Sequence, residues 1–211
     1  MSSASLSAAA VPVDARVGPQ ALLPTRFGEF RIRTYPSPDG GEANVALVRG
    51  DPSRPDSVLV RVHSECLTGD VFSSLRCDCG AQLDAALERL GRSDDAVLVY
   101  LRQEGRGIGL EAKIQAYALQ DRGLDTYDAN VALGYPPDAR TYEAAAHILA
   151  DLGARRVRLL TNNPDKVRAL SALGIEVVEV LPLLAGVNPH NRNYLNAKRE
   201  RFGHLLPSTL R

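Results

Sequence analysis

Three cysteines lie close together in the sequence, and their spacing fits a metal site. Cys66, Cys77 and Cys79, the only cysteines of the chain, fall within fourteen residues. Zinc favours such soft thiolate ligands, and a C-x-C pair with a third cysteine fills three corners of a tetrahedron. Structural zinc sites have four protein ligands, whereas catalytic sites leave one position for water, so this cysteine trio favours a zinc-dependent hydrolase. His63, three residues before Cys66, is an alternative fourth ligand that would close the site.

Two other interpretations of the cysteine trio stay open from the sequence. A disulfide would leave one thiol over, and the chain shows no pattern of a secretory signal. The second interpretation is that the cysteines are buried apolar residues. Cys77 and Cys79 flank Asp78, so in an extended segment both thiols would point to one face and the carboxylate to the other.

The overall charge of the chain excludes a broad attraction to nucleic acid or to anionic membranes. Its 211 residues are 45% hydrophobic and 24% charged, and 25 basic residues balance 25 acidic ones. No apolar run approaches the roughly eighteen residues that span a bilayer, so we expect a cytoplasmic protein without nucleic-acid or membrane partners. We expect a disordered tail over residues 1–18, one catalytic domain over 19–206 and a flexible C-terminus over 207–211.

The rhythm of apolar residues changes along the chain. Residues 27–63 contain three β-like segments, GEFRIRTY, NVALVRGD and SVLVRVH, which predict three strands joined by hairpin-type turns. The second half alternates apolar runs (97–101, 157–161, 175–180) with helical stretches (around 108–122, 139–152, 165–173). We therefore expect a single α/β domain with a mixed sheet: a β-rich N-terminal half and a parallel portion covered by helices, in three α-β-α layers.

Polar residues follow two of the predicted parallel strands, where ligands settle in open α/β sheets. A glycine-rich loop with Glu104 and Arg106 follows the first apolar run of the second half, and an ordinary glycine turn is the alternative. After the next run, Asn163 can cap a helix that begins at Pro164. The free N–H groups of that helix, with Lys166 beside them, suit an anion; a plain capped helix is the alternative.

Four ordered motifs resemble one protein family. They are RVHSECLTGDVFSSLRCDCGAQL, RQEGRGIGL, KIQAYALQ and LTNNPDK, and together they resemble GTP cyclohydrolase II of riboflavin biosynthesis, from about Pro24 to Leu206. The resemblance implies that GTP is opened at C8 of its imidazole ring, with release of formate and pyrophosphate. The product would be 2,5-diamino-6-ribosylamino-4(3H)-pyrimidinone 5′-phosphate, formed in the first step of that pathway. Zinc and magnesium as cofactors and a homodimer are implied as well.

The same resemblance implies which residues bind zinc and nucleotide. The cysteine trio falls on the zinc positions, where zinc-activated water would attack C8. Cationic side chains suit the phosphates, and a carboxylate can accept hydrogen bonds from guanine or hold magnesium. The nucleotide-binding positions are Arg61, Val62, His63, Ser64, Glu65, Gln82, Glu104, Gly105, Arg106, Thr126, Thr161 and Lys166.

Three further residues, Asp138, Arg140 and Tyr117, match catalytic positions of the family. The resemblance implies a proton acceptor at Asp138 and a nucleophile at Arg140. Because arginine stays protonated, we expect Arg140 instead to stabilise charge on the departing pyrophosphate. The alternative for Asp138 is the N-cap of a helix over 139–152. Tyr117 favours full release of formate, and a core tyrosine is its alternative.

Other functions stay open beside this one. The chain would be a paralogue if it stops at the formamidopyrimidine or serves a specialised pathway. A non-catalytic zinc module that binds nucleotide is a third hypothesis, which zero net charge and a three-cysteine ligand set disfavour. Asn44, Ala197 and Phe202 depart from the family's pattern, and we expect none of them to touch the motifs.

Overall fold

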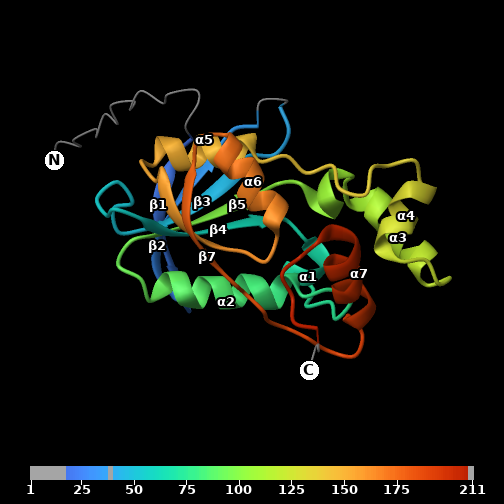
Figure 1. The fold of residues 1–211 in the computed structure, drawn as a ribbon. Helices are drawn as coiled ribbons and strands as arrows, with labels where there is room; N and C mark the ends of the chain where they lie inside the picture. The colour runs from blue at the N-terminus through green and yellow to red at the C-terminus, as the bar shows by residue number, and fades with distance from the viewer. Residues whose placement is uncertain (1–17, 38–39, 209–211) are drawn as a thin grey trace.

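The computed structural model describes residues 18–37 and 40–208, and Figure 1 shows their fold. Apart from Gly18, the predicted tail over residues 1–18 lies outside the described residues, as do residues 209–211 of the predicted flexible C-terminus. No helix in the described ranges is long and apolar enough to cross a membrane.

A seven-stranded mixed sheet forms the middle layer, in the order β1-β2-β3-β5-β4-β6-β7. Its first four strands in that order pair antiparallel, and β5, β4, β6 and β7 pair parallel, so the predicted mixed sheet with a parallel portion is confirmed. The strands are β1 (Gln20–Thr25), β2 (Gly28–Tyr35), β3 (Asn44–Arg49), β4 (Val58–Ser64), β5 (Ala96–Leu101), β6 (Arg156–Leu160) and β7 (Glu176–Leu181).

The predicted hairpin between β3 and β4 is wrong, because β5 lies between them in the sheet. The burial pattern gives the physical reason. β3 alternates buried and half-buried residues, as expected beside a partly open face, whereas the first six residues of β4 are all buried. A strand buried on both faces belongs in the middle of a parallel sheet and reaches its neighbour through a crossover helix. β1 was not predicted; it carries Pro24 and lies at the edge of the sheet, where proline is tolerated.

Helices cover both faces of the sheet, which confirms the three-layer prediction. α2 lies along one face, and α5 and α6 lie on the other (Figure 1). The helical elements are α1 (Leu67–Asp70), α2 (Cys79–Gly91), the 3-10 turn η1 (Glu104–Gly107), α3 (Leu110–Gln120), α4 (Thr126–Ala132), α5 (Glu143–Asp151), α6 (Pro164–Ala172) and α7 (Arg192–Phe202). Of these, α1, α2, α4 and α7 were not predicted.

Two apolar cores hold the layers together, one on each face. Val60, Val97 and Leu149 belong to the larger core, on the side of α5 and α6. Leu90 and Leu98 belong to the smaller one, under α2. The central strands are therefore fixed from both sides, and the loops that leave their carboxyl ends start from rigid positions.

Candidate functional site

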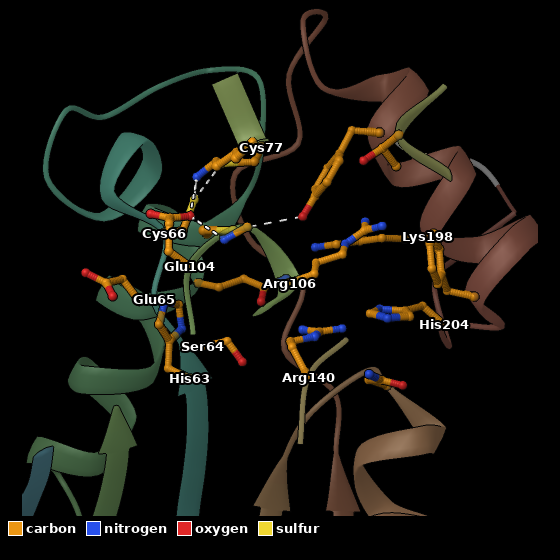
Figure 2. A pocket seen from close by; sticks show the side chains of 18 of the residues that line it. His63, Ser64, Glu65, Cys66, Cys77, Glu104, Arg106, Arg140, Lys198 and His204 are labelled. Atoms are coloured by element: carbon orange, nitrogen blue, oxygen red, sulfur yellow. Dashed lines mark hydrogen bonds and ion pairs between the residues drawn. The ribbon is translucent and has the colours of Figure 1, made fainter. Parts of the chain in front are cut away.

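One pocket gathers nearly all the predicted site residues at the carboxyl ends of β4, β5 and β6. Figure 2 shows thiol and carboxylate groups on one side of it and cationic side chains on the other. The two exceptions are Val62, whose backbone oxygen accepts a 2.7 Å bond from Lys166 Nζ, and Asp138, which pairs with Arg140. The predicted residues that line the pocket are Arg61, His63, Ser64, Glu65, Cys66, Cys77, Cys79, Gln82, Glu104, Gly105, Arg106, Tyr117, Thr126, Arg140, Thr161 and Lys166.

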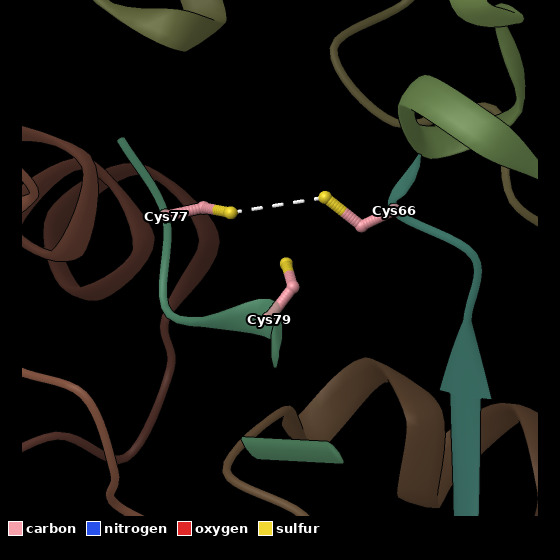
Figure 3. A group of neighbouring side chains, drawn as sticks. All are labelled: Cys66, Cys77 and Cys79. Atoms are coloured by element: carbon pink, nitrogen blue, oxygen red, sulfur yellow. Dashed lines mark hydrogen bonds between the residues drawn. The ribbon is translucent and has the colours of Figure 1, made fainter. Parts of the chain in front are cut away.

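The cysteine trio converges on one point (Figure 3). Its sulfur atoms lie within 4.8 Å of one another, and Cys66 Sγ is 3.7 Å from Cys77 Sγ. A disulfide needs a separation of about 2.05 Å, so all three thiols are free. A tetrahedral zinc with Zn–S distances of roughly 2.3 Å holds its sulfurs about 3.8 Å apart. The spacing of the trio fits that metal.

Two glycines let the backbone approach the sulfurs closely. A Cβ on Gly69 of α1 would lie 2.8 Å from Cys77 Sγ and 3.2 Å from Cys66 Sγ. A Cβ on Gly80 would lie 2.2 Å from the Gly69 oxygen, so α1 and the start of α2 touch through their main chains. We call the main chain at Gly69 and Gly80 the glycine cradle. Both positions must be glycine, because neither leaves room for a Cβ.

The segment between Cys77 and Cys79 is not extended, and Asp78 does not point to solvent. Cys79 begins α2, and Asp78 is buried, with bonds of 2.6 Å from both Lys198 Nζ and Gln82 Nε2. Lys113 Nζ also lies 3.2 Å from Cys66 Sγ. Cys66 and Cys77 are buried, but the surroundings of the trio are polar, which disfavours the interpretation as apolar core cysteines.

His63 faces a carboxylate rather than the trio. Its Nε2 lies 3.1 Å from both oxygens of Asp70, which also accepts bonds from the Cys66 N–H (3.0 Å) and the Tyr100 hydroxyl (2.9 Å). Among the described residues, the group whose ligand atoms converge contains the three cysteines without His63. Burial lowers the pKa of His63, so the ring is neutral and ties the strand end to the trio through Asp70.

Five cations line the opposite side of the pocket, and we call them the cationic wall: Arg61, Arg106, Arg140, Lys166 and Lys198. Arg61 donates to the Leu160 oxygen (3.0 Å) and to Gln82 Oε1 (2.8 Å). Burial, followed by the positive charges of Arg61, Arg140 and Lys198, lowers the pKa of Lys166. Arg61 Nε and one terminal nitrogen of Arg106 are buried and have no hydrogen-bond partner in the described part of the chain. Such unpaired donors and excess positive charge suit a polyanion.

Arg140 and Asp138 form a two-point ion pair. Arg140 donates to both Asp138 oxygens, with Nε distances of 2.9 and 3.1 Å. Burial opposes the charge of Asp138, but the bonds from Arg140 prevail and lower its pKa; the same pairing raises the pKa of Arg140. The alternative of an N-cap at Asp138 is wrong, because α5 begins at Glu143 after Tyr142. A permanently protonated Arg140 suits charge stabilisation.

The carboxylates of the pocket differ in how much of their hydrogen-bonding capacity is used. Glu104 accepts from the N–H groups of Leu67 (2.6 Å) and Gly105 (2.7 Å) and from Lys113 Nζ (2.7 Å). Glu65 pairs with Arg102 at 2.8 Å, and burial, followed by the charge of Glu104, raises its pKa. Glu65 therefore keeps more free oxygen capacity than Glu104.

Tyr117 and Thr126 come from the helices at the outer end of the pocket. The Tyr117 hydroxyl lies 3.2 Å from Thr68 Oγ1, and burial raises its pKa. Tyr117 is therefore a protonated phenol next to α1, close to the trio, and not an isolated core residue. Thr126 is the first residue of α4, whose N-cap Asp125 accepts two backbone N–H bonds.

Sequence reasoning missed the contribution of the C-terminal segment. Tyr194, Lys198 and Phe202 of α7 line the pocket, as does His204. Their spacing of four residues places the three helical residues on one face, a signal that was present in the sequence. The expectation that the departing residues touch none of the motifs is wrong at two positions. The Arg106 guanidinium lies 4.2 Å from the ring centre of Phe202, and Asn44 Oδ1 accepts a 2.9 Å bond from the Arg102 N–H. Lys113, another missed residue, contacts the trio as described above.

Comparisons with known proteins identify one family. The sequence model of the family described as GTP cyclohydrolase II matches residues 15–182. The chain is 55% identical to GTP cyclohydrolase-2 of Acinetobacter baumannii (strain SDF) over 87% of this chain and 92% of that protein. It is 51% identical to GTP cyclohydrolase-2 of Histophilus somni (strain 2336), over 89% and 87%.

Two longer proteins are also similar over part of their length. Riboflavin biosynthesis protein RibBA of Aquifex aeolicus is 53% identical over 88% of this chain and 46% of that protein. Among solved structures, RibBX, a two-domain 3,4-dihydroxy-2-butanone 4-phosphate synthase from A. baumannii, aligns with a TM-score of 0.46. That alignment has 24% identity over 78% of this chain and 39% of the other.

Proposed function

The chain belongs to the GTP cyclohydrolase II family and is an enzyme of that type, and from this premise we propose the reaction it performs. GTP is opened at C8 of its imidazole ring, and formate and pyrophosphate are released. The remaining product is 2,5-diamino-6-ribosylamino-4(3H)-pyrimidinone 5′-phosphate. The observation that carries the proposal is the pocket itself, which joins three convergent thiols to a wall of cations. The name of the Aquifex aeolicus relative supports a place in riboflavin biosynthesis.

Zinc is the cofactor that the trio fits. The sulfur spacing agrees with zinc coordination, and Gly69 of α1 keeps free of a Cβ the space beside Cys66 Sγ and Cys77 Sγ. Zinc held by three thiolates would supply Lewis-acid chemistry at its remaining position. Magnesium is proposed to accompany the triphosphate, and Glu65, with its free oxygen capacity, is the carboxylate best suited to face it.

The two sides of the pocket orient the substrate. The guanine ring is proposed to lie against the cysteine trio, and the triphosphate against the cationic wall. In that orientation the phosphate oxygens reach the unpaired nitrogens of Arg61 and Arg106. They also offset the positive charges that, after burial, lower the pKa of Lys166. The opposite orientation would leave both buried donors unsatisfied, at a cost of about 1–3 kcal/mol each.

Residues near the reacting groups take roles that fit their contacts. Arg140 stabilises charge on the departing pyrophosphate, and Asp138 fixes the direction of its guanidinium. Tyr117 positions water or the ring near the trio through its neutral hydroxyl. The nucleotide-binding roles of the other predicted residues, the homodimer and the cytoplasmic location are part of the same proposal.

Product analysis tests the proposed reaction. Zinc-loaded protein with GTP and magnesium is followed by mass spectrometry and a formate assay, with one formate and one pyrophosphate expected per GTP consumed. Persistence of GTP in the presence of stoichiometric zinc would refute the activity. A ring-opened formamide without formate would instead identify the shortened reaction. Cys77→Ser is expected to bind GTP without opening it, which separates the enzyme from a non-catalytic zinc module.

A further inference from the structure

Lys113 is a buried cation that the proposed chemistry leaves without a role. It lies in α3, and its side chain is 9% exposed. Its Nζ makes two contacts at once, 2.7 Å to Glu104 Oε1 and 3.2 Å to Cys66 Sγ. An ammonium at that distance from a sulfur donates a charge-assisted hydrogen bond when the sulfur is a thiolate.

The surrounding chain holds this ammonium in place. The Glu104 carboxylate that orients it is itself fixed by the N–H groups of Leu67 and Gly105. Gly105 has a φ of +63°, and a Cβ there would lie 3.1 Å from Lys113 Cβ. The EGRG turn can therefore pack directly on Lys113, and the lysine reaches the sulfur from a defined direction.

Charge balance gives this contact a function. Three thiolates around a divalent cation carry a net negative charge, and a buried negative charge costs free energy unless it is compensated. Glu104 adds another negative charge beside the trio. Lys113 is the cation in contact with both groups.

We propose that Lys113 is a positioning residue for the metal centre: its bond to Cys66 Sγ directs that sulfur and offsets the negative charge of the trio. The inference rests on the proposed zinc site. Partners that orient ligands from outside the coordination sphere change metal affinity by about 10- to 100-fold when removed. Lys113 therefore sets the affinity for zinc and the electron density on Cys66, separately from any contact with nucleotide.

The test measures metal binding rather than turnover. Zinc affinity is obtained by competition with a chelator, and the cobalt-substituted protein reports the sulfur-to-metal charge-transfer band. We expect Lys113→Met to weaken zinc binding 10- to 100-fold and to move the band to lower energy, because the thiolate loses its donor. Lys113→Arg keeps charge and donors and is expected to stay within about threefold of the wild-type protein.

Two further variants keep the outcome decisive. Lys113→Gln keeps a side chain of similar size with a hydrogen-bond donor but no charge, and it replaces Lys113→Met in the measurement if the Met variant fails to fold. Its loss of zinc affinity is expected to be intermediate. Glu104→Gln keeps Lys113 and is expected to change zinc affinity less than Lys113→Met does. Wild-type affinity and an unshifted band in the folded Met or Gln variant would overturn the inference, as would equal losses in Lys113→Met and Glu104→Gln. Failure of the wild-type protein to bind zinc would instead overturn the proposed function.

Discussion

The two sides of the pocket handle charge in opposite ways. On the thiol side, each charged group has a partner: Lys113 contacts Glu104 and Cys66, and His63 contacts Asp70. On the other side, the cationic wall meets the carboxylates of Asp78 and Asp138 in the described part of the chain, and two guanidinium nitrogens stay unpaired.

This difference separates a prebuilt centre from an incomplete one. The charged groups named on the thiol side are already paired, and the three sulfurs converge as a metal site would require. The cationic wall brings like charges together: burial, followed by the charges of Arg61, Arg140 and Lys198, lowers the pKa of Lys166, and a bound anion would relieve that repulsion. Substitutions on the two sides should therefore be separable: one set changes metal binding, and the other changes nucleotide binding.

The largest effect is expected from closing the glycine cradle. In Gly69→Ala the new Cβ would lie 2.8 Å from Cys77 Sγ, 3.0 Å from Cys79 Cβ and 3.2 Å from Cys66 Sγ, so it would push the three cysteines apart. Zinc content should fall from about one per chain to below about a tenth, and GTP turnover should fall with it by at least 1000-fold. GTP affinity of the zinc-free protein should change less than threefold. Elemental analysis and calorimetry measure these quantities.

Gly174→Ala is the control for this experiment. Its φ of +83° imposes strain, but no described atom lies within 4 Å of the added Cβ. We expect a loss of stability of about 1 kcal/mol with normal zinc content. Full zinc content in Gly69→Ala would show that the cradle is not what holds the sulfurs together.

Removing one cation from the opposite side comes next. In Lys166→Met, GTP affinity should fall about 100-fold, because the variant loses the buried amino group that is proposed to bind the phosphates, while zinc affinity stays unchanged. Arg168→Met on the same helix is the matched control, since Arg168 is 71% exposed, and it should bind GTP normally. Loss of zinc in Lys166→Met would break the separation between the two sides.

A smaller effect is expected at the aromatic residue that supports Arg106. In Phe202→Leu the guanidinium loses the ring 4.2 Å below it, and GTP affinity should fall about three- to tenfold. Phe72→Leu, at a ring that is 70% exposed, should have no effect on binding. Equal affinities of Phe202→Leu and the wild-type protein would remove Phe202 from the site.

The last effect concerns the pH dependence of stability. Burial, followed by the charge of Lys198, lowers the pKa of His204 to about 2. The pKa of this histidine in the unfolded chain is about 6.5. Below that pH the unfolded chain binds a proton at this site and the folded chain does not, so the free energy of unfolding falls as pH falls. In His204→Gln this contribution is absent. Between pH 7 and pH 5 the free energy of unfolding of His204→Gln should therefore fall by about 1–2 kcal/mol less than that of the wild-type protein, as measured by denaturation. An identical fall in both proteins would contradict the assignment.

Local sequence patterns predicted the parts of the molecule that depend on near neighbours. The Asn163 cap before Pro164 is confirmed, with the Asn163 side chain accepting from the Asp165 N–H at 2.9 Å. The mixed sheet and its three layers are confirmed as well. The position of β5 between β3 and β4 was missed, because an alternating pattern states which face is buried but not which strand is the neighbour.

Within the site, the ordered motifs predicted which residues line the pocket, but they did not predict with which residues these pair. Lys198 lies 120 residues from Asp78, with which it pairs at 2.6 Å, and no local pattern links them. Nothing in the sequence around Lys113 distinguishes it from other helix residues; its contact with Cys66 depends on the fold. The sequence predicted that the Asp78 carboxylate would point away from the thiols. It is buried instead, and Lys198 compensates its charge.

The packing of α7 has a consequence for how the site is made during synthesis. Asn191 donates to the Cys77 oxygen at 3.2 Å across 114 residues, and the Leu205 N–H donates to the Asn162 oxygen at 2.8 Å. Contacts of such long sequence separation form late. While the chain emerges from the ribosome, the sheet can assemble first, but the pocket gains its last side only when α7 has left the exit tunnel. A nascent chain halted before Asn191 would hold a nearly complete fold and an unfinished site.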